Sequence, residues 1–152
     1  MATTTDSATD SGLALDAWQA GVAGGIAGAA VMAVLVSLMN PPTLAAAIPA
    51  LYGLSGGVAG WVVHLSHGAV LGVALAAIAE SGVIGQSTGA VVGLGVAWGV
   101  VTWALLAALV MPVWLGAVGF GGAPPFPNFA VPSLLWHVVY GGVLGVGYAA
   151  LR

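Results

Sequence analysis

Four long apolar stretches, each nearly free of charge, constrain this chain more than any other feature of its sequence. About 20 apolar residues wound as an α-helix cross the hydrocarbon core of a bilayer. The stretches lack the period-two alternation of barrel strands, and backbone exposed to lipid must satisfy its own hydrogen bonds. The sequence therefore predicts four transmembrane α-helices, at Ala17–Met39, Val58–Ala79, Gly89–Val110 and Pro132–Leu151.

The scarcity of charge argues against a water-soluble protein. Of 152 residues, 61% are hydrophobic and 3% are charged, whereas a soluble domain carries about 25% charged residues. One basic residue cannot form the patch that nucleic acids require. The absence of cysteine excludes disulfides, thiolate metal ligands and cysteine nucleophiles. The expected partner is the lipid bilayer, and no nucleic-acid partner is expected.

Proline and polar residues separate the stretches. Asn40-Pro41-Pro42 is expected to end the first helix, and Met111-Pro112 to end or kink the third. The Thr/Ser/Asp-rich start of the chain lacks the basic region of a signal peptide and is expected to be disordered. The chain thus divides into an acidic tail at 1–16, a first transmembrane hairpin at 17–79 and a second at 89–152, which together form one membrane domain.

The second and fourth stretches resemble each other. Trp61–Ile78 aligns with Leu134–Leu151, and His64 falls on His137. The first and third stretches match more faintly, through Gly24 with Gly95, Gly28 with Gly99, and Asn40-Pro41 with Met111-Pro112. The sequence therefore predicts an all-α polytopic membrane four-helix bundle, built from two tandem-duplicated helical hairpins. Two spans per unit place the expected pseudo-two-fold axis along the membrane normal.

Four spans would place both termini on one side of the membrane. All charged residues then share that side, whereas the opposite loops, 40–57 and 111–131, carry no charge. The positive-inside rule, applied to Arg152, places this side in the cytoplasm. We therefore expect a multi-pass protein of the cell membrane with cytoplasmic N- and C-termini.

Glycines recur at the i, i+4 spacing that lets membrane helices approach closely. The pairs are Gly21/Gly25, Gly24/Gly28, Gly68/Gly72, Gly89/Gly93, Gly95/Gly99 and Gly141/Gly145. Tight packing within the bundle is their expected use. Such faces can also contact other membrane subunits or a second copy of the chain.

His64 and His137 are the main candidates for function, because ionisable residues within membrane spans are costly and often functional. Each shares the glycine face of its helix, so the two could face each other across the bundle. His67 lies about 60° from His64 around the helix, and its counterpart is Tyr140. These four residues form the candidate binding site. Equally, a neutral histidine near a helix start can act only as an interfacial anchor.

Three kinds of ligand fit such a site. Two facing imidazoles could ligate a haem axially, although that side offers no basic residue for the propionates. His64, His67 and His137 could bind copper or zinc as metal ligands. The histidines could instead relay protons or hold a lipophilic redox ligand, on which Trp98 and Trp103 could stack.

Several motifs carry a resemblance to a known family. They are the acidic tail, WxxHxxHG at Trp61–Gly68, the loop Pro124-Pro-Phe-Pro-Asn-Phe129, and WHxxYG at Trp136–Gly141. The chain resembles small four-span membrane proteins of haloarchaea, a family of unknown function sometimes mislabelled histidine kinase. The resemblance covers nearly the whole chain and implies no activity. The sequence contradicts the kinase label, since it has neither an ATP-binding domain nor a solvated phospho-acceptor helix.

No nucleophile elbow, phosphate loop, zinc-protease motif or carboxylate pair occurs, so no enzymatic activity is expected. The leading hypothesis is a small non-enzymatic subunit or binding module that holds a metal, haem or lipophilic redox ligand between His64 and His137. One alternative is a small transporter or proton-conducting oligomer with the histidines along its path. The other is a structural or assembly subunit of a larger membrane complex.

Overall fold

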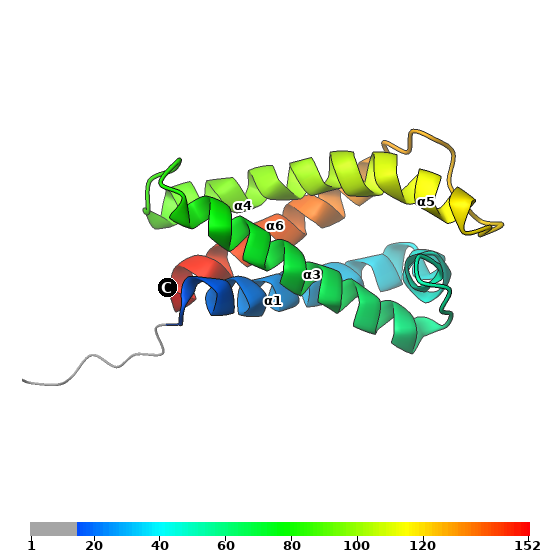
Figure 1. The fold of residues 1–152 in the computed structure, drawn as a ribbon, viewed down its shortest axis with the longest axis horizontal. Helices are drawn as coiled ribbons and strands as arrows, with labels where there is room; N and C mark the ends of the chain where they lie inside the picture. Colours follow the sequence, from blue (N-terminus) through cyan, green and yellow to red (C-terminus); the bar gives the residue numbers. More distant parts are fainter. Residues whose placement is uncertain (1–14) are drawn as a thin grey trace, which may run out of the picture.

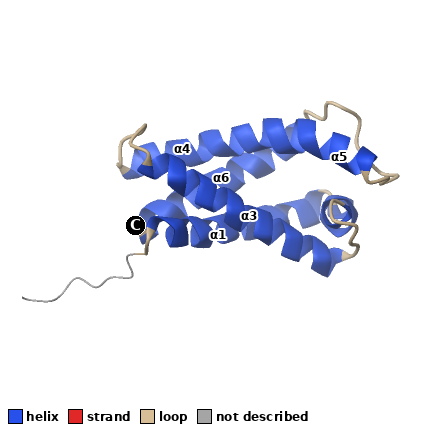
Figure 2. Ribbon diagram, in the orientation of Figure 1, coloured by secondary structure: helices blue, strands red, loops and turns tan. Residues whose placement is uncertain are grey.

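The chain forms a four-helix membrane bundle, as predicted (Figures 1 and 2). The computed structural model describes residues 15–152, and within that range it contains helices and loops but no strand. The expected tail at 1–16 therefore lies almost entirely outside the described residues. The elements are α1 (Ala17–Met39), η1 (Thr43–Ala47), α2 (Ile48–Ala50), α3 (Gly57–Glu80), α4 (Thr88–Thr102), η2 (Trp103–Val110), α5 (Met111–Ala117) and α6 (Val131–Leu151). The four spans are α1, α3, the continuous run Thr88–Ala117, and α6.

Glycines form the two closest helix contacts, α1 against α3 and α4 against α6. A Cβ on Gly25 or on Gly68 would collide with the backbone of the other residue, and Gly95 and Gly141 stand in the same relation. Because no side chains intervene, the backbones themselves touch, which maximises dispersion contact in a lipid environment. Each hairpin is therefore held by paired glycine faces.

The glycine pair Gly24/Gly28 does not pack within its own hairpin, as its alignment with Gly95/Gly99 suggested. Both residues face α6 of the other hairpin, and a Cβ on Gly28 would lie 2.7 Å from the carbonyl oxygen of Tyr140. By its packing, Gly95 corresponds to Gly25, so the predicted match of Gly24 with Gly95 is wrong by one residue. One face of α1 thus binds its own hairpin partner, and the neighbouring face joins the two hairpins.

The bundle is closed along α1 and α6 but open along α3 and α4. A full pseudo-two-fold arrangement would pack α3 on α4 as closely as α1 packs on α6, yet α3 and α4 make few contacts. Figure 1 shows them diverging from the turn that joins them. In the corrected register, Leu94 and Trp98 occupy the places of Gly24 and Gly28. Their bulk keeps α3 at a distance where glycines would have admitted it.

Pro112 does not end the third span, which continues to Ala117. A proline lacks the N–H that would bond to the carbonyl four residues earlier, here that of Ala108. The Ala108 oxygen instead accepts a hydrogen bond from the backbone N–H of Asn128, at 2.9 Å. The widened π-helical turns of η2 directly precede the proline. The sequence predicted that the helix would either end or kink at Met111-Pro112. The prediction of a helix end is wrong.

α1, by contrast, ends at Met39 as predicted, and η1 and α2 follow it. Within α2, Pro49 lies as Pro112 does in α5, in the first turn after a π-helical segment. The carbonyl oxygen of Ala45, four residues before Pro49, accepts a hydrogen bond from Gly56 N–H at 3.0 Å. The structural counterpart of Pro112 is therefore Pro49, not Pro41.

Both ends of the described chain and the α3–α4 turn lie at one end of the bundle (Figure 1). Leu15 N–H donates to the carbonyl oxygen of Leu151 at 2.8 Å, and Arg152 forms an ion pair with Glu80 at 2.8 Å. The Tyr148 hydroxyl donates to the same carboxylate at 2.8 Å. The hydrogen bond to Glu80 raises the pKa of the Arg152 guanidinium. The charges of the described residues thus gather at this end, as expected.

Candidate functional site

A cavity of about 520 Å³ lies within the half of the bundle near the uncharged loops. Its walls come from α1, α3, η2 and α6, and the segments η1–α2 and α5 contribute at the loop end. Pockets of roughly 300–1,000 Å³ hold small organic ligands in other proteins. Val70 on α3 and Leu106 on η2 line the cavity and are also exposed on the outer surface. The cavity therefore opens between α3 and the third span, where a bilayer would place lipid.

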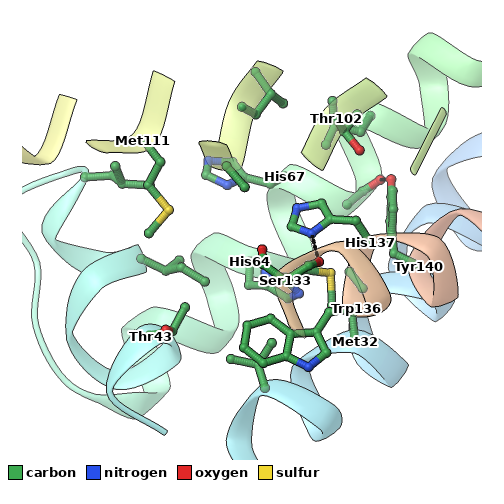
Figure 3. Close-up of a pocket in the computed structure, with 18 of the residues that line it drawn as sticks. Met32, Thr43, His64, His67, Thr102, Met111, Ser133, Trp136, His137 and Tyr140 are labelled. Carbon is green, nitrogen blue, oxygen red and sulfur yellow. Dashed lines mark hydrogen bonds between the residues drawn. The ribbon is translucent and has the colours of Figure 1, made fainter. Parts of the chain in front are cut away.

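All four predicted site residues line this cavity (Figure 3). His64 and His67 come from α3, and His137 and Tyr140 come from α6. The structure thus brings together residues that the sequence separates by about half of the chain. Their environments differ, however, and only some of their polar atoms are free to bind a ligand.

His64 is the most deeply buried of the three histidines, with 7% of its surface exposed. Its Nε2 atom is buried and has no hydrogen-bond partner among residues 15–152. Leaving such an atom unpaired costs about 1–3 kcal/mol. The protein therefore keeps an unsatisfied polar atom beside an apolar cavity.

His137 is held by its own helix. Its Nδ1 atom lies 2.7 Å from the carbonyl oxygen of Ser133, one turn earlier in α6 (Figure 3). This bond directs the ring and leaves Nε2 without a hydrogen bond in the described part of the chain. His64 and His137 are also close enough to interact electrostatically. Both histidines therefore line one cavity, and that they bind a ligand between them stays a prediction.

His67 and Tyr140 are already engaged in hydrogen bonds. The Tyr52 hydroxyl lies 2.7 Å from Nε2 of His67 at the loop end of the cavity. The Tyr140 hydroxyl donates to the carbonyl oxygen of Gly68 at 3.0 Å, which links α6 to α3. Both residues thus have structural roles in addition to lining the site.

The predicted metal centre does not assemble in this arrangement. Within residues 15–152, no group of three or more His, Cys, Asp or Glu side chains is placed to hold a metal ion. His67 is instead hydrogen-bonded to Tyr52 through Nε2. Two imidazoles without a third ligand of these types are a poor match for the tetrahedral sites of zinc.

The tryptophans near the site differ from those that the sequence suggested. Trp98 donates a hydrogen bond from Nε1 to the carbonyl oxygen of Leu71 at 3.1 Å, and Trp103 stacks edge-on against Phe129. Neither residue is part of the cavity wall, whereas Trp136 and Trp114 are. In the sequence, the WHxxYG motif places Trp136 next to His137. That motif could have indicated that Trp136 lines the cavity.

Thr102 and Ser133 also line the cavity and were not predicted to take part in the site. The Thr102 hydroxyl donates to the carbonyl oxygen of Gly99 at 3.0 Å. Ser133 supplies the carbonyl that orients His137.

Comparisons of the chain with protein-family models, with curated proteins and with solved structures found no match.

Proposed function

We propose that this integral membrane protein is a small non-enzymatic binding module for a lipophilic molecule. The ligand lies in the cavity between α3 and the third span, with its polar end at His64 and His137. The observation that carries the proposal is a ligand-sized cavity whose wall holds both histidines, with Nε2 of His137 free of hydrogen bonds within residues 15–152. A bound polar group would pair with that atom.

The cavity wall favours an apolar ligand. Its side chains are mainly aliphatic, sulfur-containing or aromatic, including Met32, Val36, Ile48, Leu71 and Trp136. None of the lining residues is an acid, a lysine or an arginine. The exposed positions of Val70 and Leu106 at its mouth allow entry from the bilayer rather than from water. A molecule dissolved in lipid could therefore reach the histidines without crossing an aqueous phase.

The position of the cavity supports binding over transport. Its wall extends along α3 only to Leu71, and along α6 only to Tyr140. The other half of the bundle is filled by the fully buried side chains of Leu75, Leu144 and Tyr148. A pathway through the histidines would have to displace this packing.

The transporter and assembly alternatives stay predictions. The cell-membrane location and the cytoplasmic termini are also predictions. With the termini in the cytoplasm, the cavity would lie near the extracytoplasmic surface.

Two variants of α3 test the proposal by blocking the cavity. Val70→Trp places an indole at the mouth, whereas Val73→Trp places the same group on the helix outside the cavity wall. Both positions are exposed, so both variants should fold. Mass spectrometry of solvent extracts should find a lipophilic molecule bound to the wild type and to Val73→Trp but depleted in Val70→Trp.

Equal retention by the two variants, or no bound molecule in the wild type, would contradict the proposal. An absorption spectrum and a metal analysis of the same samples test the competing ligands. Haem absorption bands, or copper or zinc in stoichiometric amount, would replace the lipophilic ligand with one of those cofactors.

A further inference from the structure

We infer that the ligand presents a hydrogen-bond donor to His137, so that the site selects a hydroxyl-bearing lipophilic molecule over its ether or carbonyl counterpart. Phenols, hydroquinones and sterol-like alcohols belong to this chemical class. The inference rests on the proposed function and specifies its ligand. It follows from which nitrogen of His137 carries the proton, and from how the neighbouring donors are used.

The proton of His137 is located by Ser133. Because a backbone carbonyl only accepts hydrogen bonds, the Nδ1 atom 2.7 Å from the Ser133 oxygen must be the donor. A neutral imidazole carries one N–H, and a charged one is costly in an apolar cavity. Nε2 of His137 therefore offers a lone pair.

His64 makes no hydrogen bond within residues 15–152 that would locate its proton, and its Nε2 is covered by protein atoms. The accepting nitrogen that the cavity offers is therefore Nε2 of His137.

Three protein donors on the cavity wall are already used. The Tyr140 hydroxyl donates to Gly68, the Thr102 hydroxyl to Gly99, and the Trp136 indole N–H to the sulfur of Met39 at 3.0 Å. The oxygen atoms of Tyr140 and Thr102 keep lone pairs, which again accept hydrogen bonds. The Ser133 and Thr43 hydroxyls can act in either sense, and the Tyr52–His67 pair keeps one unused O–H or N–H at the loop end of the cavity. Around His137 itself, acceptors outnumber unused donors.

This balance determines which polar group fits. A ligand hydroxyl can donate to Nε2 of His137. An ether or carbonyl oxygen would bring its own lone pairs against that nitrogen and leave it unpaired. Sites built to hydrogen-bond a ligand group discriminate strongly against analogues that lack it, because their buried polar atoms then stay unsatisfied.

A matched pair of probes tests the inference without any mutation. 4-Decylphenol and 4-decylanisole share ring and tail, but the second has a methyl ether in place of the hydroxyl. Binding to the full chain in nanodiscs is measured as a function of the mole fraction of probe in lipid. The phenol should bind at least about tenfold more tightly than the ether. His137→Phe should reduce this ratio towards one, whereas Val73→Trp should preserve it.

The possible failures are distinguishable. Equally tight binding of the phenol and the ether, both blocked by Val70→Trp, would overturn the donor inference and leave the proposed function intact. No binding of either probe would count against the proposed function itself. A ratio that persists in a folded His137→Phe variant would show that His137 does not supply the acceptor and would overturn the inference.

Discussion

The hydroxyl of Tyr140 donates a hydrogen bond to the carbonyl oxygen of Gly68, 3.0 Å away, and so joins α6 to α3 across the bundle. Gly68 also packs against Gly25 on α1, and Tyr140 packs against Gly28. The bond therefore lies where three helices meet, at the inner end of the cavity. It connects the pair of helices that carry the histidines.

Tyr140→Phe should lower stability by about 0.5–1.5 kcal/mol, the usual range for a hydrogen bond between membrane helices. The change removes one oxygen atom and preserves the ring that fills the space. Reversible unfolding in mixed micelles would measure the difference. Tyr52→Phe is the matched control, because its bond to His67 lies at an exposed residue. An effect of Tyr140→Phe no larger than that of Tyr52→Phe would contradict the prediction.

Gly95→Ala should destabilise the bundle, whereas Gly93→Ala should not. A Cβ on Gly95 would collide with the carbonyl of Gly141, so α4 and α6 must separate, at a cost of about 1–3 kcal/mol. A Cβ on Gly93 meets nothing within 4 Å, and alanine favours helix over glycine by up to about 1 kcal/mol. Melting temperatures in detergent provide the measurement. Similar losses in both variants would show that the contact at Gly95 is unimportant.

Trp98→Phe should loosen the open side of the bundle. The indole N–H bonds to the Leu71 carbonyl and directly links α4 to α3, helices that otherwise make few contacts. The chain has no cysteine, so spin labels can be attached to cysteines introduced at Val70 and Leu106. The distance distribution between the labels should broaden and move to longer values. Trp114→Phe, which loses a bond from α5 to Leu51 rather than a bond to α3, should leave the distribution unchanged.

Pro112→Ala should weaken the attachment of the loop that precedes α6. The new N–H at position 112 would compete with Asn128 for the carbonyl oxygen of Ala108. Hydrogen exchange of the Asn128 amide should therefore become several-fold faster. Pro125→Ala, an exposed position in the same loop, is the control and should have no effect on that amide. Unchanged protection of Asn128 in Pro112→Ala would show that the loop is held by other contacts.

The glycine spacing predicted close packing but not which helices would meet. Five of the six predicted pairs face a neighbouring helix, and Gly89/Gly93 does not. Spacing within one helix cannot choose a partner, because it says nothing of how the other helices are rotated. Gly24 and Gly25 are adjacent in sequence, yet they contact different helices. That one-residue difference is why the alignment of the first and third stretches failed.

The candidate site was predictable in its residues but not in its chemistry. The repeated motifs identified His64 and His137, and both line the cavity. Sequence could not show that Tyr52 occupies His67, because the two are joined only when the α2 segment folds against α3. That contact engages the third imidazole in a hydrogen bond within the protein.

By itself, the sequence determined the lipid environment, the number of spans and their positions except for the end of the third, since hydropathy and length are local properties that act before any helix meets another. Tertiary structure decided that the bundle opens between α3 and α4. On that side of the bundle, Leu94 and Trp98 occupy the positions that Gly24 and Gly28 occupy in α1. A bulky side chain keeps two helices apart only when the fold places it between them, and this cannot be known from one helix alone. The cavity exists because α3 and α4 do not pack closely against each other. The unpaired nitrogen of His64 beside it likewise results from the packing of several helices and cannot be predicted from the sequence of any one of them.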